Sequence, residues 1–120
     1  MNEMNLLPNY YQAYIEESKL VEYALNPENE RGKHKARVLE SSLGFNLSNW
    51  EQLRRAILDA LSDHEATFIS ETPFGIKYKV VVTITGPNER KANLLTIWQY
   101  DRQPEGTTRD WPRLITLYIT

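Results

Sequence analysis

Cysteine is absent from this sequence of 120 residues, which excludes disulfide bonds, thiolate metal sites and a cysteine nucleophile. Histidine is scarce: there are only His34 and His64, and neither has carboxylates at a spacing that would complete a metal site. His64 follows a predicted helix, where a C-terminal cap is the better interpretation. The sequence also lacks a glycine-rich phosphate loop and a nucleophile elbow. We therefore expect no metal and no cofactor.

Long apolar runs are missing as well. No stretch approaches the roughly 20 apolar residues that are needed to cross a bilayer. Residues 1–11 do not show the basic region followed by an apolar stretch that marks a secretory signal. We expect a cytoplasmic protein with no membrane partner.

The length of 120 residues suits one domain with a single core. The formal net charge of −2 hides an asymmetry, because residues 1–30 hold six of the 16 acids but only one of the 14 Lys and Arg residues. The rest of the chain is therefore mildly basic. Such a body permits nucleic-acid binding without requiring it, since strong non-specific binders are usually far more basic.

The beginning of the chain has little regular pattern. Residues 1–14 are polar and rich in tyrosine, and we expect them to form an extended lead-in to a single α+β domain over residues 15–120. A short helix should begin at Ser18, which is a good N-cap. It should end at Asn26, because the residue before Pro27 avoids the helical region.

Two further helices are predicted. One should begin near Gly32 or Lys33 and stop at Gly44, a residue type that commonly ends helices. The next should begin with a capping box, in which the Ser48 and Glu51 side chains each bond the other residue's amide. Its core stripe repeats at helical spacing: Trp50, Leu53, Ile57 and Leu61.

After residue 64 the apolar period changes to the alternation that is typical of strands. Turn signals separate four such segments, over residues 66–71, 76–84, 92–100 and 113–119. Consecutive strands joined by short turns indicate an antiparallel meander. The predicted fold class is α+β, with two or three N-terminal helices packed on one face of a four-stranded antiparallel sheet.

The alternation also predicts which face each strand residue occupies. The expected core residues are Tyr78, Val80, Val82, Leu95, Ile97, Ile115, Leu117 and Ile119. The residues then left facing outward are Lys77, Lys79, Thr83, Thr96, Trp98, Tyr100, Thr116 and Tyr118. Such a face could bind a phosphate backbone and stack bases, although Thr, Trp and Tyr favour strands in any case. Arg113 has core parity but lies at a strand end.

A basic segment, residues 31–37, lies where the second helix should begin. It holds four Lys or Arg side chains and His34, with no acid among them. Cations are unfavourable at a helix N-terminus, so their presence there is consistent with an anion site. The alternative interpretation is a solvated basic turn that balances the acidic residues 16–30.

Several strings resemble a little-characterised bacterial domain family over roughly residues 14–119. They are Leu25-Asn26-Pro27, Gly32-Lys33-His34-Lys35-Ala36-Arg37, Leu43-Gly44-Phe45 with Asn49-Trp50, Thr72-Pro73-Phe74-Gly75-Ile76-Lys77-Tyr78, Thr85-Gly86-Pro87-Asn88, Trp98 and Arg113-Leu114-Ile115-Thr116. Relatives of this kind are free-standing small proteins and C-terminal toxin tips of contact-dependent inhibition and related polymorphic toxins. Their order of helices and strands is similar to the fold shared by barnase, the EndoU nucleases, the colicin ribonucleases and RelE.

The resemblance implies a metal-independent endoribonuclease of the bacterial toxin type, with transfer RNA as a candidate substrate. The motif residues of the family fall here on Gly32, Lys35 and Ala36, on Gly75, Lys77 and Tyr78, and on Arg113, Leu114 and Thr116. It also implies a neutralising antitoxin or immunity-type partner from a neighbouring gene.

Metal-free RNA cleavage needs charge stabilisation at the phosphate and the transfer of two protons. On that basis the predicted catalytic residues are His34, Lys35, Arg113 and Thr116, and the predicted RNA-binding residues are Lys33, Arg37, Lys77, Tyr78, Trp98 and Tyr118. The alternative from a different functional class is a non-catalytic module that docks an acidic partner protein through residues 31–37. A third interpretation is a purely structural basic turn.

Overall fold

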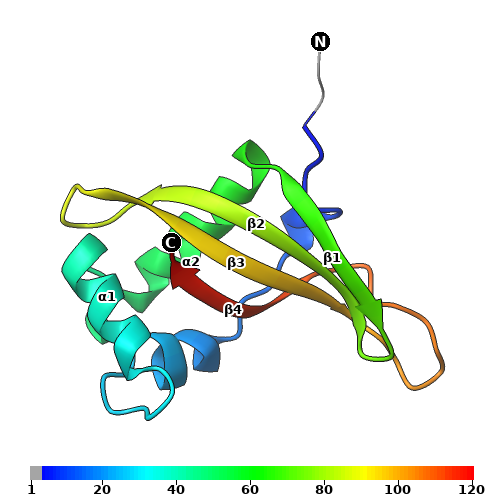
Figure 1. The fold of residues 1–120 in the computed structure, drawn as a ribbon, viewed down its shortest axis with the longest axis horizontal. Coiled ribbons are helices and arrows are strands. Elements are labelled where there is room, and N and C mark those ends of the chain that lie inside the picture. Colours follow the sequence, from blue (N-terminus) through cyan, green and yellow to red (C-terminus); the bar gives the residue numbers. More distant parts are fainter. Residues whose placement is uncertain (1–3) are drawn as a thin grey trace.

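The structure is a computed structural model that describes residues 4–120. It has the predicted α+β class, with helices on one face of an antiparallel meander (Figure 1). Within the described residues the sheet order is β1-β2-β3-β4, so β1 and β4 are the edge strands. The elements are η1 (Tyr10–Gln12), η2 (Lys19–Ala24), α1 (Lys33–Leu43), η3 (Leu47–Asn49), α2 (Trp50–Ala60), η4 (Leu61–Asp63), β1 (Ala66–Thr72), β2 (Gly75–Thr85), β3 (Lys91–Asp101) and β4 (Arg113–Ile119).

Helix α1 occupies the predicted segment and begins against η2. Gly44 adopts a left-handed conformation with φ 85° and ends the helix, as predicted. At the other end, a Cβ on Gly32 would lie 2.0 Å from the Tyr23 carbonyl oxygen. Only glycine therefore allows the start of the basic segment to pack directly on η2. The η2 turn itself is a π-helix, with the Leu25 amide bonded to the Leu20 carbonyl at 2.8 Å.

The predicted capping box at Ser48 and Glu51 is wrong by two residues. The reciprocal pair is Asn46 and Asn49: the Asn46 side chain accepts from the Ser48 amide at 2.9 Å, and the Asn49 side chain accepts from the Asn46 amide at 2.8 Å. These bonds enclose the 3-10 turn η3, after which α2 begins at Trp50. Asparagine caps a helix as well as serine does, so the sequence contains two overlapping candidate capping boxes, at residues 46–49 and 48–51.

The C-terminal end of α2 is tied to the sheet by His64. Its Nδ1 lies 2.8 Å from the Ala60 carbonyl oxygen, and its Nε2 accepts from the Thr83 amide at 3.1 Å. The predicted capping role is thus confirmed. The ring is the neutral tautomer with its proton on Nδ1, because Nε2 must accept.

An extended lead-in was predicted over residues 1–14. Residues 1–3 lie outside the described residues, and residues 4–14 pack against the rest of the domain. Leu7 is 1% exposed and belongs to the core, and the Tyr100 hydroxyl donates to the Pro8 carbonyl. Tyr14 then pairs with the start of β4, because its carbonyl accepts from the Leu114 amide at 2.9 Å. The N-terminal segment therefore completes the domain rather than preceding it.

The predicted facing of β2 is confirmed, but that of β3 is wrong. Thr96, Trp98 and Tyr100 were expected outside and are buried, at 0%, 0% and 5% exposed. Trp98 pairs with Tyr78 across the sheet and lies on the helix-covered face. Its indole donates to the Thr96 hydroxyl at 2.8 Å, which itself donates to the Val80 carbonyl at 2.6 Å. These bonds satisfy both polar groups inside the core. Leu95 and Ile97 occupy the uncovered face instead.

Strand β4 contains a register shift that alternation could not predict. Ile97 pairs with Thr116, whereas the next residue, Trp98, pairs with Leu114. The extra residue, Ile115, bulges, so that both Leu114 and Leu117 are fully buried. Beyond the bulge Thr116 keeps the predicted outward side, and Tyr118 is 44% exposed.

Candidate functional site

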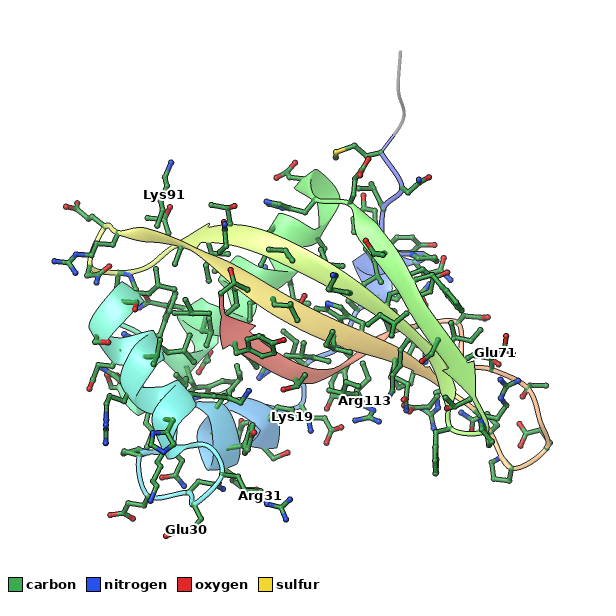
Figure 2. The ribbon with its side chains drawn as sticks, viewed as in Figure 1. Lys19, Glu30, Arg31, Glu71, Lys91 and Arg113 are labelled. Atoms are coloured by element: carbon green, nitrogen blue, oxygen red, sulfur yellow. The ribbon has the colours of Figure 1, made fainter. Side chains whose placement is uncertain are left out.

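A cleft of about 580 Å³ lies between the edge strand β4, the turn η2 and the start of the basic segment. Figure 2 shows Lys19 and Arg113 along it, with Arg31 on the same side of the molecule. Asn29 shapes the loop above η2, because its side chain accepts from the Arg31 and Gly32 amides at 2.9 Å each. The lining residues are Glu16, Ser18, Lys19, Glu22, Tyr23, Asn29, Arg31, Arg113, Ile115 and Thr116.

Lys35 crosses from α1 to β4 at the edge of this cleft. Its Nζ donates to the Leu117 carbonyl at 2.9 Å and to the Thr116 hydroxyl at 3.4 Å. The same ammonium lies 5.0 Å from the centroid of the Tyr118 ring and 5.8 Å from that of Tyr23. Burial lowers the pKa of Lys35 below its ordinary value. The structure thus brings Lys35, Thr116 and Tyr118 together.

Arg113 lines the same cleft but is held by carboxylates. Its Nε donates to one Asp101 oxygen at 2.9 Å and its Nη2 to the other at 3.0 Å. The remaining Nη1 lies 3.5 Å from a Glu16 oxygen, at the cleft wall. The bond from Arg113 holds the pKa of Asp101 below its usual range, and the same bond raises the pKa of Arg113. Arg113 is therefore a fixed cation with one nitrogen turned toward the cleft.

His34 is exposed and does not line the cleft. It lies with Lys35, Val38, Leu39, Tyr118 and Ile119 around a separate recess of about 170 Å³. Lys35 lines this recess and also donates to Thr116, which lines the cleft, so the recess adjoins the cleft at Lys35. The structure therefore places His34 beside Lys35 and apart from Arg113.

Lys33 and Arg37 face a different part of the molecule. They lie one helical turn apart on α1 and border a pocket of about 560 Å³ with Leu25, Pro27 and Leu47. Lys33 also pairs with Glu30 at 3.5 Å. These two cations are not part of the cleft around Arg113.

The remaining predicted RNA-binding residues lie on the sheet. Lys77 is on the uncovered face of β2, whereas Tyr78 packs edge-on against Phe68 and Tyr100 on the covered side. Trp98 is wrong as a stacking residue, because a fully buried indole cannot contact a base. Neither Lys77 nor Tyr78 borders the cleft.

The cleft also contains residues that the sequence did not single out, which are Glu16, Lys19, Glu22 and Tyr23, besides Arg31 of the basic segment. The first four belong to η2 or the segment before it, which was assigned only as a short helix in an acidic stretch. The only sequence signal for these residues was the alternation of the two glutamates with Lys19 and Tyr23. The sequence does not show that η2 lies beside β4, so it gave no reason to connect these residues with Arg113.

Residues 4–120, which the structure describes, lack two features. There is no cluster of three or more His, Asp or Glu side chains that could hold a metal ion. None of the described helices is long and apolar enough to cross a membrane.

The fold and the cleft define a class: small α+β proteins in which helices cover one face of an antiparallel meander and cations gather beside its last strand. The chain belongs to the family described as Domain of unknown function (DUF6883), whose sequence model matches residues 6–120. No curated protein and no solved structure is significantly similar to it.

Proposed function

We propose that this protein is a metal-independent endoribonuclease of the bacterial toxin type, which holds the phosphate of an RNA chain beside Lys35 in the cleft. One observation carries the proposal: the Lys35 ammonium meets the Thr116 hydroxyl at 3.4 Å and the Tyr118 ring at the edge of the cleft that Arg113 lines. A cation, a hydroxyl donor and an aromatic face are the groups that bind a phosphate and stack the adjacent base.

The charges around the cleft support an anionic ligand. Lys19, Arg31 and Arg113 line it and Lys35 borders it, against the two carboxylates of Glu16 and Glu22. Arg113 is partly neutralised by Asp101 and by Glu16, and its Nη1, which donates to Glu16 at 3.5 Å, lies at the cleft wall. The volume of about 580 Å³ falls within the range of roughly 300–1,000 Å³ that is usual for small-ligand sites.

The proposed reaction uses the 2′-hydroxyl of the RNA as the nucleophile. Its oxygen attacks the adjacent phosphorus, the bond from phosphorus to the 5′ oxygen breaks, and a 2′,3′-cyclic phosphate and a 5′-hydroxyl result. Lys35 and Arg113 stabilise the negative charge that grows on the phosphoryl oxygens, and Thr116 donates a hydrogen bond. These side chains supply the positive charge that a metal ion supplies in other nucleases.

Two protons must also move: one leaves the 2′-hydroxyl and one reaches the 5′ oxygen. His34 is the predicted acid or base, because imidazole titrates near neutral pH. His34 and Lys35 line the same recess, so a substrate held at Lys35 lies next to His34. Proton transfer contributes about 10²–10⁴-fold. His34→Ala should therefore leave more residual activity than Lys35→Met if charge stabilisation dominates.

The proposed activity implies a cellular substrate and a neutralising partner. A ribonuclease with this site would act on RNA in the cytoplasm, with transfer RNA as the proposed substrate. Its own cell would need a neutralising antitoxin or immunity-type protein, encoded by a neighbouring gene.

The test is incubation of the purified protein with total bacterial RNA in EDTA, with the products separated on a denaturing gel. Lys35→Met removes the proposed phosphate ligand, and Lys91→Met removes an exposed lysine from the far end of β3 as the matched control. We expect discrete fragments from the wild type and Lys91→Met and intact RNA with Lys35→Met. An oligonucleotide with a 2′-deoxy sugar at the cleavage position should resist cleavage.

The variant must be shown to be folded, because Lys35 also bonds the Leu117 carbonyl. Circular dichroism and the urea midpoint provide this check, and Lys35→Arg keeps the charge as a second variant. Intact RNA with the folded wild type would reject the ribonuclease. It would favour the non-catalytic module that docks an acidic partner through residues 31–37.

A further inference from the structure

One whole face of the sheet carries no helix (Figure 1). The pairing of the strands sets its residues in cross-strand rows, because Cα partners share a face. One row is apolar and consists of Val81, Leu95 and Tyr118. The next contains Lys79 and Ile97. We name these residues, with Lys77 and Thr116, the open face.

The open face differs from the surface that alternation predicted. Trp98 and Tyr100 are buried on the other side, and Leu95 and Ile97 take their place. Val81 is 37% exposed and Tyr118 is 44% exposed. The centre is therefore aliphatic, with a single aromatic ring at the β4 edge. Base stacking needs successive aromatic rings, so this surface is poorly suited to RNA.

Its charge is mostly positive. Among the strand residues on this face that the structure describes, the cations are Lys77, Lys79, Lys91 and Arg113. The acid is Asp101, and Arg113 neutralises it with two hydrogen bonds. A ligand of this face therefore meets exposed apolar side chains and uncompensated lysines together.

The area is close to that of a small protein interface. Two strands of eleven residues and two of seven, at about 3.3 Å per residue and 4.8 Å per strand, cover roughly 570 Å². A stable interface buries roughly 600–1,000 Å² from each partner.

We infer that the open face is a docking surface for an acidic protein. The rows define what the partner must present. It needs apolar side chains opposite Val81 and Leu95, and carboxylates opposite Lys79, which lies two residues, or about 7 Å, along the strand from Val81. This inference does not depend on the ribonuclease, because the face meets the cleft only at the β4 edge, through Arg113 and Thr116, and its centre at Val81 and Lys79 lies outside the cleft.

The test places a photo-cross-linking amino acid at Val81 of the full chain in cells of its own organism. The control position is Leu47, which is similarly exposed at 40% but lies on η3 away from the sheet. We expect one acidic protein to cross-link at Val81 and not at Leu47. That protein, once identified by mass spectrometry and purified, is titrated against the wild type and against charge reversals.

Lys79→Glu should weaken its binding on the order of tenfold or more, whereas Arg55→Glu on the exposed side of α2 should change it little. Affinity should also fall with added salt. Lys79→Gln, which removes the charge without reversing it, should give a smaller loss in the same direction. Cross-linking to RNA, to a second copy of the chain, equally at both positions, or at neither would overturn the inference. Equal effects of Lys79→Glu and Arg55→Glu would overturn it as well.

Discussion

The pair formed by Asp101 and Arg113 fixes the cation at the cleft wall, and its contribution to stability can be measured directly. The change is Asp101→Asn, which keeps the shape of the side chain and removes its charge. The carboxylate accepts two bonds from Arg113 and a third from Gln99 at 2.7 Å. The single amide oxygen of asparagine can accept only some of these three hydrogen bonds. Its NH₂ group would instead face a donor of the Arg113 guanidinium, and two donors cannot bond each other.

The expected loss is about 1–2 kcal/mol at pH 7. Hydrogen bonds to charged groups contribute about 1.5–3 kcal/mol, and fully exposed ion pairs only about 0.2–1 kcal/mol. Both side chains of this pair are about a quarter exposed, at 25% and 24%, so an intermediate value applies. For a domain of this size the loss corresponds to a fall in Tm of roughly 3–10 °C.

The pH dependence gives the sharper assay. Arg113 depresses the pKa of Asp101 in the folded protein, so the unfolded chain binds this proton more readily. The stabilisation is therefore complete above the unfolded pKa of about 3.9 and is lost as the pH falls through the lower folded pKa. Urea unfolding of the wild type and Asp101→Asn, in steps from pH 7 downward, should show a difference that is constant above about pH 5 and shrinks below about pH 4.

A difference that does not change with pH would refute this reasoning, because it would mean that packing rather than charge causes the loss. Glu71→Gln is the matched control. Glu71 pairs with Arg102 at 3.0 Å but is 59% exposed, so its loss should stay below about 1 kcal/mol.

Three further predictions concern the fold. Gly32→Ala should destabilise the protein by about 2 kcal/mol or more in urea unfolding, because the added Cβ would lie 2.0 Å from the Tyr23 carbonyl oxygen; an unchanged midpoint would contradict the close packing of α1 on η2. Trp98→Phe should remove the most blue-shifted part of the tryptophan fluorescence, since the Trp98 indole is fully buried; loss of the red edge instead would place this indole in solvent. Asn49→Ala should cost about 1 kcal/mol and more than Ser48→Ala, because the Asn49 side chain closes the cap; the reverse order in thermal melts would restore the capping box first predicted.

The element order and most of the core were predictable because they depend on local periodicity. The facing of β3 was not, because the segment from Leu94 to Trp98 has apolar residues on both sides. Burial of Thr96 decides its orientation, and this threonine is acceptable in the core only because Val80 and Trp98 satisfy its hydroxyl. These hydrogen bonds join residues of two different strands, so the sequence pattern of β3 alone cannot predict them.

The site was predictable to a similar extent. Lys35 and Thr116 are 81 residues apart in sequence and were chosen separately, yet they meet in the structure. The acidic wall of the cleft was missed, because Glu16 becomes relevant only where the chain before η2 pairs with β4 through Tyr14. Proximity of this kind follows from tertiary packing rather than from spacing along the chain.

Lys35 has a consequence beyond the cleft. Strand β4 is an edge of the sheet, and an unprotected edge can recruit a strand from another molecule and begin intermolecular aggregation. The Lys35 ammonium donates to the Leu117 carbonyl and cannot accept a hydrogen bond in return. It therefore blocks the pairing of a foreign strand with β4 at Leu117. A chain that lost Lys35 would expose this edge to pairing with another molecule, whether or not the cleft binds RNA.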